Sequence, residues 1–161
     1  MNKIVVAGLL SFFVATPSLA AQTKGNLGVS LSTAGAYGAQ AEFGISSMAN
    51  GAPVSAQVFW KHDSQDIGNA TAWDSTAIGV AGIYDFTAMT KLDSKVHPYA
   101  GAGLMSVSHD RNGPWAGGAY NGVGSGLYVT GGVRYNLESQ LDVDLNYNNF
   151  GDITLGLNLS F

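Results

Sequence analysis

Large apolar residues alternate with small or polar residues along most of this chain. The clearest case is 153–161, in which every odd position is large and apolar and every even position is small or polar. Successive side chains of an extended strand point to opposite faces. The pattern therefore predicts a strand with one apolar and one polar face, ending on the aromatic Phe161.

Seven further segments show a period of two, and no segment after the N-terminus shows the periodicity of a helix. These segments are 27–31, 37–46, 54–61, 75–86, 96–107, 127–137 and 141–148. The alternation is weak in 96–107, where Ala and Gly dominate. The polar or glycine-rich stretches 62–71, 87–95 and 108–124 are predicted to be loops. The sequence therefore predicts an all-β fold of eight strands.

The first 20 residues have the features of a secretory signal peptide. Lys3 provides the positive charge, an apolar run follows, and Ser18-Leu19-Ala20 forms a cleavage site after Pro17. The apolar run is too short for a transmembrane helix. We expect cleavage after Ala20, which leaves 21–161 as one domain.

Composition narrows the class of protein further. Hydrophobic residues make up 46% of the chain and charged residues only 11%, against about a quarter in average proteins. The formal net charge of -4 argues against a nucleic-acid partner. Cysteine is absent, which excludes disulfides and thiolate metal sites. After the signal peptide, no apolar run is long enough for a membrane helix.

The charged residues of the predicted strands lie on the polar faces. They are Glu42, Lys61, Asp85, Arg134, Asp142 and Asp144. In a soluble barrel the apolar faces would point inward and these charges would meet water. In a membrane barrel the apolar faces meet lipid, and the charges sit in the lumen and must pair. The polar faces carry mostly small residues, and two of the longer polar connections (62–71 and 108–124) fall at the outer end, which favours the membrane barrel.

The outward aromatic residues support the same orientation. When strands run alternately up and down from a periplasmic N-terminus, these residues sort into two groups by height. The predicted outer girdle contains Tyr37, Trp60 and Tyr147, and the periplasmic girdle contains Tyr84, Phe86, Tyr135 and Phe161. Two interfaces of a bilayer select two such girdles. The connection 87–95 is longer than a typical periplasmic turn and is the feature that fits least well. We predict a closed, eight-stranded, up-and-down transmembrane barrel, since closure satisfies every backbone group in lipid.

At 98–104, at 132–147 and in the terminal strand, the chain resembles small eight-stranded outer-membrane barrels of Gram-negative bacteria. These are the OmpA-type, OmpX-type and opacity-type proteins of the porin family. The resemblance implies a place in the outer membrane, in contact with its lipid and lipopolysaccharide. It also implies insertion by the barrel-assembly machinery after periplasmic chaperoning, with Phe161 as the C-terminal assembly signal. No peptidoglycan-binding domain follows Phe161, so we expect no cell-wall anchoring of the OmpA kind.

The lumen charges are open to two interpretations, a structural network or a path for ions. Buried charge in a narrow barrel favours a structural network. The hairpin of 127–137 and 141–148 places Arg134 opposite Asp142 or Asp144, because positions of one parity share a face. We expect Arg134 to be the central cation of this network.

Catalytic and metal sites are not expected. His62 with Asp63 and Asp66, or His109 with Asp110, has the chemistry of a metal ligand set but not the spacing. Outer-membrane lipid A deacylases carry a His-x-Ser pattern, and this chain has Ser108 directly before His109 instead. We therefore expect no cofactor, no metal and no catalysis.

The expected function is structural, or the presentation of two outer loops to a surface ligand of unknown identity. A narrow, low-conductance channel is the alternative, because inner-face glycines leave space that water can occupy. These glycines are Gly28, Gly44, Gly79, Gly101, Gly103, Gly132 and Gly156. A lipid A-modifying enzyme and a soluble ligand-binding barrel are weaker alternatives.

Overall fold

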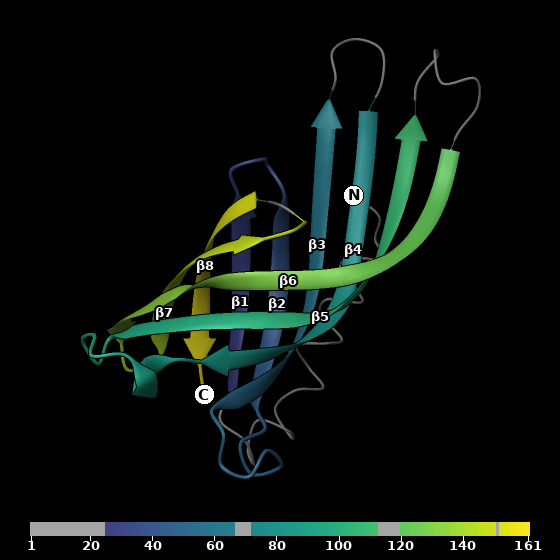
Figure 1. The fold of residues 1–161 in the computed structure, drawn as a ribbon. Coiled ribbons are helices and arrows are strands. Elements are labelled where there is room, and N and C mark those ends of the chain that lie inside the picture. Colours follow the sequence, from purple (N-terminus) through teal and green to yellow (C-terminus); the bar gives the residue numbers. More distant parts are fainter. Residues whose placement is uncertain (1–24, 67–71, 113–119, 151) are drawn as a thin grey trace.

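The computed structural model describes residues 25–66, 72–112, 120–150 and 152–161 and shows a closed antiparallel barrel (Figure 1). Its strands, each paired with the next along the chain, are β1 (Gly25–Ser32), β2 (Tyr37–Gly44), β3 (Val54–Asp66), β4 (Ala72–Asp85), β5 (Val96–Asn112), β6 (Tyr120–Glu138), β7 (Leu141–Asn148) and β8 (Asp152–Ser160). A short 3-10 helix, η2 (Thr87–Met89), lies between β4 and β5. Eight antiparallel strands confirm the predicted fold class. The predicted signal peptide lies outside the described residues.

Pairing of the first and last strands closes the barrel. Asn26 of β1 lies opposite Ser160 of β8, and the register continues to Ser32 opposite Thr154. Backbone hydrogen bonds extend this pairing by one residue, since Gly25 and Phe161 exchange both N–H···O bonds at 3.1 and 3.0 Å. Closure leaves no free edge within the barrel wall, as a barrel in lipid requires.

Alternation along the strands sorts residues to the two sides of the wall as the sequence predicts. Large apolar side chains face outward, with exposed fractions between 41% and 67%. They include Val29, Leu31, Ile78, Val80, Leu104, Leu127, Val133, Leu145, Leu155, Leu157 and Leu159. The opposite parity is buried and carries Glu42, Lys61, Asp142, Asp144 and several amide side chains. The barrel thus has an apolar outside and a partly polar inside, the inverse of a soluble protein.

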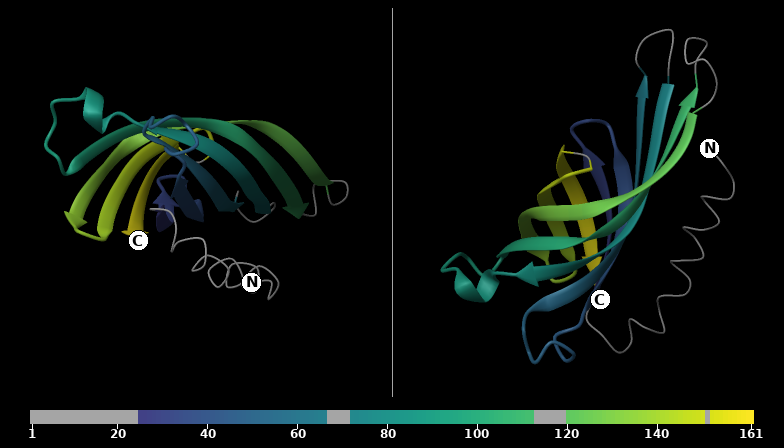
Figure 2. Two further views of the ribbon diagram at one scale, coloured as in Figure 1. Left: turned by 90° about the horizontal axis from the view of Figure 1, so that it is seen from below. Right: turned by 45° about the vertical axis from the view of Figure 1, so that its right-hand side comes forward.

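The strands differ greatly in length, and four of them form an extension beyond the barrel. β2 begins at Tyr37 opposite His62, whereas β3 continues to Asp66. β7 ends at Asn148, which lies opposite Thr130 of β6. β6 itself begins at Tyr120, so its first part extends beyond the end of β7. β4 and β5 remain paired to Ala72 and Asn112. Figure 2 shows β3 to β6 rising well past the other strands.

The prediction of loops over all of 62–71 and 108–124 is therefore wrong. Much of both stretches is strand, because β3, β4, β5 and β6 stay hydrogen-bonded to one another beyond the apolar band. The sequence of this extension has no regular alternation of large apolar and polar residues, so the pattern that reveals a strand in lipid is absent from it. The prediction of a loop over 87–95 agrees with β4 ending at Asp85 and β5 beginning at Val96.

The turns at the end that carries Gly25 and Phe161 are formed by 45–53, 86–95 and 139–140. In the first of these, Asn50 and Gly51 adopt positive φ angles of 52° and 82°, which Asn and Gly tolerate best. Within the described part of the chain, no helix has the length and hydropathy needed to cross a membrane.

Candidate functional site

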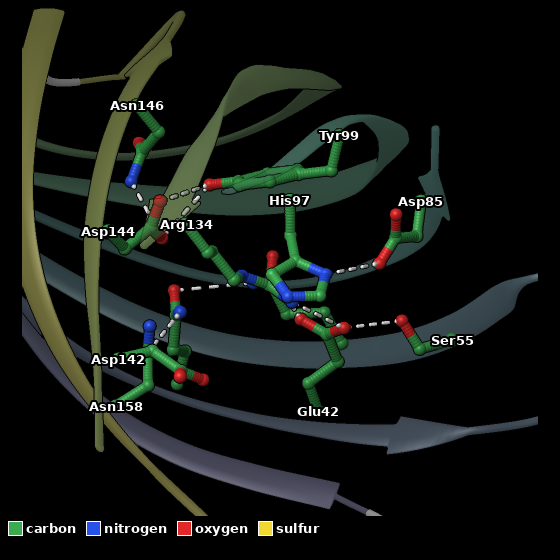
Figure 3. A network of polar contacts seen from close by, with 12 residues as sticks. Glu42, Ser55, Asp85, His97, Tyr99, Arg134, Asp142, Asp144, Asn146 and Asn158 are labelled. Atoms are coloured by element: carbon green, nitrogen blue, oxygen red, sulfur yellow. Dashed lines mark hydrogen bonds and ion pairs between the residues drawn. The ribbon is translucent and has the colours of Figure 1, made fainter. Parts of the chain in front are cut away.

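The candidate site is the polar interior of the barrel, which β2, β6 and β7 supply with charge. Their inward positions carry Glu42, Arg134, Asp142 and Asp144, and β3 adds Lys61. Glu42, Lys61, Asp142 and Asp144 are all buried, and Asp144 is only 1% exposed. Figure 3 shows most of these side chains converging from opposite walls of the barrel.

An ion pair between Arg134 and Glu42 crosses the lumen. Arg134 Nη1 donates to Glu42 Oε1 at 3.0 Å, and Nη2 donates to Oε2 at 2.5 Å. Ser55 Oγ of β3 also donates to Glu42 Oε1. The two strands, β6 and β2, are not neighbours in the sheet. A bidentate pair of this kind fixes both distance and orientation, so it ties the two walls together.

The residue that lies opposite Arg134 in the sheet is not the residue with which it forms its ion pair. Arg134 lies directly opposite Asp144, as the hairpin predicts. Its hydrogen-bonded carboxylate, however, is Glu42 of β2, a partner that the sequence did not single out. The guanidinium also lies over the ring of Tyr99, 4.4 Å from its centroid. The reach of the long side chain lets it span the narrow lumen instead of staying on its own hairpin.

Asp144 is held by a different set of groups. The hydroxyl of Tyr99 donates to both carboxylate oxygens at 2.9 Å, and Asn146 Nδ2 donates at 3.2 Å. Asn148 Nδ2 in turn donates to Asn146 Oδ1. Tyr99 thus touches both the cation and the second carboxylate, which makes Arg134, Glu42, Tyr99 and Asp144 one connected group.

The remaining predicted charges lie around this group. Asp142 accepts a hydrogen bond from Ser160 Oγ at 3.1 Å. Lys61 Nζ lies 5.6 Å from the ring centroid of Tyr128. Asp85 lies at the rim, where its carboxylate accepts from the Thr87 backbone N–H and faces His97 at 3.6 Å. With 41% of its side chain exposed, Asp85 belongs to the barrel end rather than to the buried interior.

An apolar cluster fills the lumen beside the charged group and was not predicted from the sequence. Its members are Phe59, Ala81, Ile83, Tyr99 and Tyr128, with Met105 packed against them. The rings of Phe59 and Tyr128 lie 4.1 Å apart between centroids. The signal in the sequence was the presence of large residues, above all Phe59 and Ile83, on the otherwise polar parity.

The inner glycines accommodate these side chains rather than leaving free space. A Cβ at Gly79 would collide with the ring of Phe59, and one at Gly101 would collide with Ile83. A Cβ at Gly28 would collide with the side chain of Asn158. At these three positions the expectation of water-filled space is wrong, because neighbouring side chains already occupy it.

The predicted girdle residues lie on the outward parity, all of them near strand ends except Trp60, which lies in the middle of β3. At the end opposite Gly25 and Phe161, Tyr37 packs edge-on against Trp60 with 5.7 Å between ring centroids, and His62 stacks on Trp60. Near the other end, Tyr84 and Phe86 lie 4.9 Å apart. The remaining predicted members are exposed: Tyr135, Tyr147 and Phe161.

The histidines have hydrogen-bond partners of a structural kind. His62 Nδ1 lies 3.0 Å from Thr76 Oγ1, and His109 Nδ1 lies 2.8 Å from Ser75 Oγ. Among the residues that the structure describes, no group of three or more His, Asp or Glu side chains is placed to hold a metal ion.

A comparison with family models decides the affiliation. Residues 53–158 match the model described as Opacity family porin protein. The chain belongs to the Opacity porin family. The matched segment spans β3 to β8 and so includes Arg134, Tyr99 and Asp144. No curated protein sequence matches this member of the family.

Solved structures show the same fold as this Opacity porin. Neisserial surface protein A shares 21% identity at a TM-score of 0.59, covering 86% of this chain and 94% of that one. The N-terminal β-barrel domain of Pseudomonas aeruginosa OprF has 14% identity and a TM-score of 0.60 over 86% and 96% of the two chains. A major outer membrane protein from Thermus thermophilus has 13% identity and a TM-score of 0.54 over 86% and 99%.

Proposed function

We propose that this Opacity porin is a non-catalytic outer-membrane barrel whose extension, formed by the outer parts of β3 to β6, presents a binding surface outside the cell. The observation that carries the proposal is the difference in strand length. A barrel needs strands of about 9–11 residues to cross a bilayer. β5 and β6 have 17 and 19 residues, so much of their length lies beyond what a membrane requires.

The extension has a free edge along β6, which supports its role as a binding surface. In the described part of the chain, β7 pairs with β6 only as far as Thr130, leaving Tyr120–Val129 without a strand on that side. Unpaired backbone groups along a strand edge are the groups with which an extended peptide forms a further strand. Asn149 occupies the start of this edge, donating to Leu127 O at 2.7 Å and accepting from Val129 N at 3.0 Å.

Surface exposure of the extension is tested by single cysteines in this cysteine-free chain. Ser64 and Ser108 are exposed on the extension, and Ser139 is exposed in the turn between β6 and β7. On intact cells, an impermeant maleimide should label S64C and S108C and leave S139C unlabelled until the outer membrane is permeabilised. Labelling only after permeabilisation at 64 and 108 would contradict the proposal.

A trimmed barrel tests whether the extension serves binding rather than folding. Two-residue turns would join Asp63 to Ser75 and Val107 to Gly124, pairs that lie opposite one another in the register. The trimmed chain should insert into vesicles and resist protease like the full chain, because the charged group and the apolar cluster remain. Failure to insert would show that the extension belongs to the folding unit.

A narrow channel is the second candidate, favoured by buried polar atoms. Asn26 Oδ1, Gln57 Oε1, Arg134 Nε and Asn158 Nδ2 are buried without a hydrogen-bond partner among the described residues, and such atoms are satisfied by water. The cross-lumen pair and the aromatic cluster oppose conduction. Planar-bilayer recordings at high protein load test this candidate, and the structure favours a silent bilayer.

Export and assembly complete the proposed function. We expect residues 1–20 to direct secretion and to be removed after Ala20, which the mass of the mature protein tests. Phe161 is proposed as the signal read by the assembly machinery after delivery by periplasmic chaperones. The outer girdle of Tyr37, Trp60 and Tyr147 is proposed to face lipopolysaccharide. A Phe161→Ala chain should refold in vitro but accumulate less in the outer membrane.

A further inference from the structure

The turn between β4 and β5 is a long turn at the barrel end that holds Gly25 and Phe161. Residues 86–95 separate these strands and residues 45–53 separate β2 and β3, whereas only residues 139–140 separate β6 and β7 at the same end. Figure 1 shows the turn protruding at the end of the barrel opposite the extension. Two residues are enough to join two antiparallel strands, so the additional residues of this turn need a physical explanation.

Hydrogen bonds give this turn a defined shape. The Thr87 N–H donates to Asp85 Oδ1 at 2.7 Å, and Thr87 Oγ1 lies 3.0 Å from His97 Nδ1. The Met89 N–H donates to Phe86 O at 2.9 Å to form η2. Further along, Asp93 accepts from the backbone N–H of Lys95 at 2.9 Å. The turn is therefore built by its own contacts and fixed to the rim at Thr87.

The shape of the turn presents apolar and cationic side chains together. Met89 is 72% exposed and Leu92 is 55% exposed, and Lys91 and Lys95 are exposed beside them. Burying Met89 and Leu92 in an apolar environment would be favourable, since moving large apolar side chains out of water lowers the free energy. Nothing in the described residues covers them.

The apolar part of the turn is continuous with the outward face of the barrel. The hydroxyl of Tyr84 donates to Met89 Sδ at 3.9 Å. The ring of Tyr84 packs against Phe86, and both belong to the outward parity of β4 and its end. Met89 thus lies on the lipid side of the rim, while Thr87 and Asp85 lie on its inner side.

We propose that residues 86–95 form an interfacial foot that rests on the phospholipid surface of the periplasmic leaflet. Met89 and Leu92 enter the interface next to the Tyr84–Phe86 girdle, and the ammonium groups of Lys91 and Lys95 contact headgroup phosphates. The inference rests on the proposed membrane placement of the barrel. It accounts for the length of this turn, because a two-residue turn cannot carry two apolar and two cationic side chains.

The turn 45–53 offers an internal contrast. Its Met48 is 83% exposed, but the segment contains no Lys or Arg. Exposure of a methionine alone is therefore not the basis of the proposal. The combination of apolar exposure, cationic neighbours and contact with the girdle occurs at 86–95.

Nitroxide labels at single cysteines test the foot in the full chain. The labelled chains L92C, L157C and S139C are inserted into phosphatidylethanolamine–phosphatidylglycerol vesicles, and accessibility to oxygen and to a polar nickel complex is measured. Position 157 should report lipid, position 139 water, and position 92 an intermediate depth at the interface. An aqueous value at 92 with lipid at 157 would overturn the foot alone, whereas an aqueous value at 157 would overturn the membrane placement.

Removing the cations tests the phosphate contact. L92C combined with Lys91→Gln and Lys95→Gln should shift the accessibility ratio at 92 toward that at 139. The shift should disappear in vesicles of phosphatidylcholine alone, where anionic lipid is lacking. An unchanged ratio in the anionic vesicles would overturn the assignment of Lys91 and Lys95 as headgroup contacts.

Discussion

Arg134 and Glu42 meet across the lumen, although β6 and β2 share no edge in the sheet. The pair is bidentate, lies over Tyr99 on one side and is joined by Ser55 on the other. It links walls that the hydrogen-bond ladder connects only through intervening strands. Its removal should therefore affect the whole barrel rather than one hairpin.

Single replacements of this pair should be costly. Arg134→Met leaves Glu42 buried with Ser55 as its remaining partner, and Glu42→Met leaves the guanidinium without a carboxylate hydrogen-bond partner. Each should lower the free energy of unfolding by about 3–5 kcal/mol, because one buried charge is left uncompensated. Urea titrations of the protein in vesicles measure this effect.

The double variant provides the control. Arg134→Met with Glu42→Met removes both charges and should cost less than either single change. Additive losses in the double variant would contradict a mutual pair and indicate that each side chain acts through other contacts.

The apolar cluster predicts a second stability effect. Phe59 is 2% exposed and packs on Tyr128, so Phe59→Ala should cost about 3–5 kcal/mol through the cavity it leaves. Val80→Ala on the outward face is the matched control and should cost less, because lipid fills the space. Equal losses at 59 and 80 in the same titration would argue against a packed lumen.

The orientation of the apolar band is tested by arginine substitutions. Leu157→Arg places a charge in the middle of the band and should cost about 2–4 kcal/mol in a bilayer, whereas Tyr147→Arg near the outer girdle should cost about 0–1 kcal/mol. Ser125→Arg on the extension should have no measurable effect. A Leu157→Arg chain as stable as the parent would show that this face meets water.

The free edge of β6 predicts an alternating pattern of hydrogen exchange. Since the Val129 N–H points to Asn149, the N–H groups of Leu127 and Ser125 point the same way, beyond the end of β7. Those of Tyr128 and Gly126 point to β5 instead. NMR in micelles should show fast exchange at 125 and 127 and slow exchange at 126 and 128. Uniform protection across these four amides would mean that the edge is covered.

The sequence predicted the barrel because lipid imposes a strict pattern on 153–161 and on the other apolar faces. It failed for the extension, where Ser64 and Asp74 lie opposite one another in strands whose sequence has no regular alternation of large apolar and polar residues. Hairpin register was predictable, since Arg134 does lie opposite Asp144. The pair with Glu42 was not, because it depends on how a closed wall brings distant strands within reach of one long side chain.

The apolar cluster in the lumen is a second feature that the sequence alone did not predict. Phe59 and Gly79 are cross-strand neighbours, and the ring occupies the space over the glycine. A glycine on the inner parity therefore signals either free space or a large neighbour. The two cannot be distinguished until the register of β3 and β4 is known.

The most direct test of a lipid-facing barrel is fractionation of cells combined with electrophoresis before and after boiling. We expect recovery of the mature chain in the detergent-extracted outer membrane and a change in migration on boiling, since a closed barrel resists detergent until heated. Recovery as a soluble periplasmic protein, with no change on boiling, would contradict the outward apolar face on which every proposal above depends.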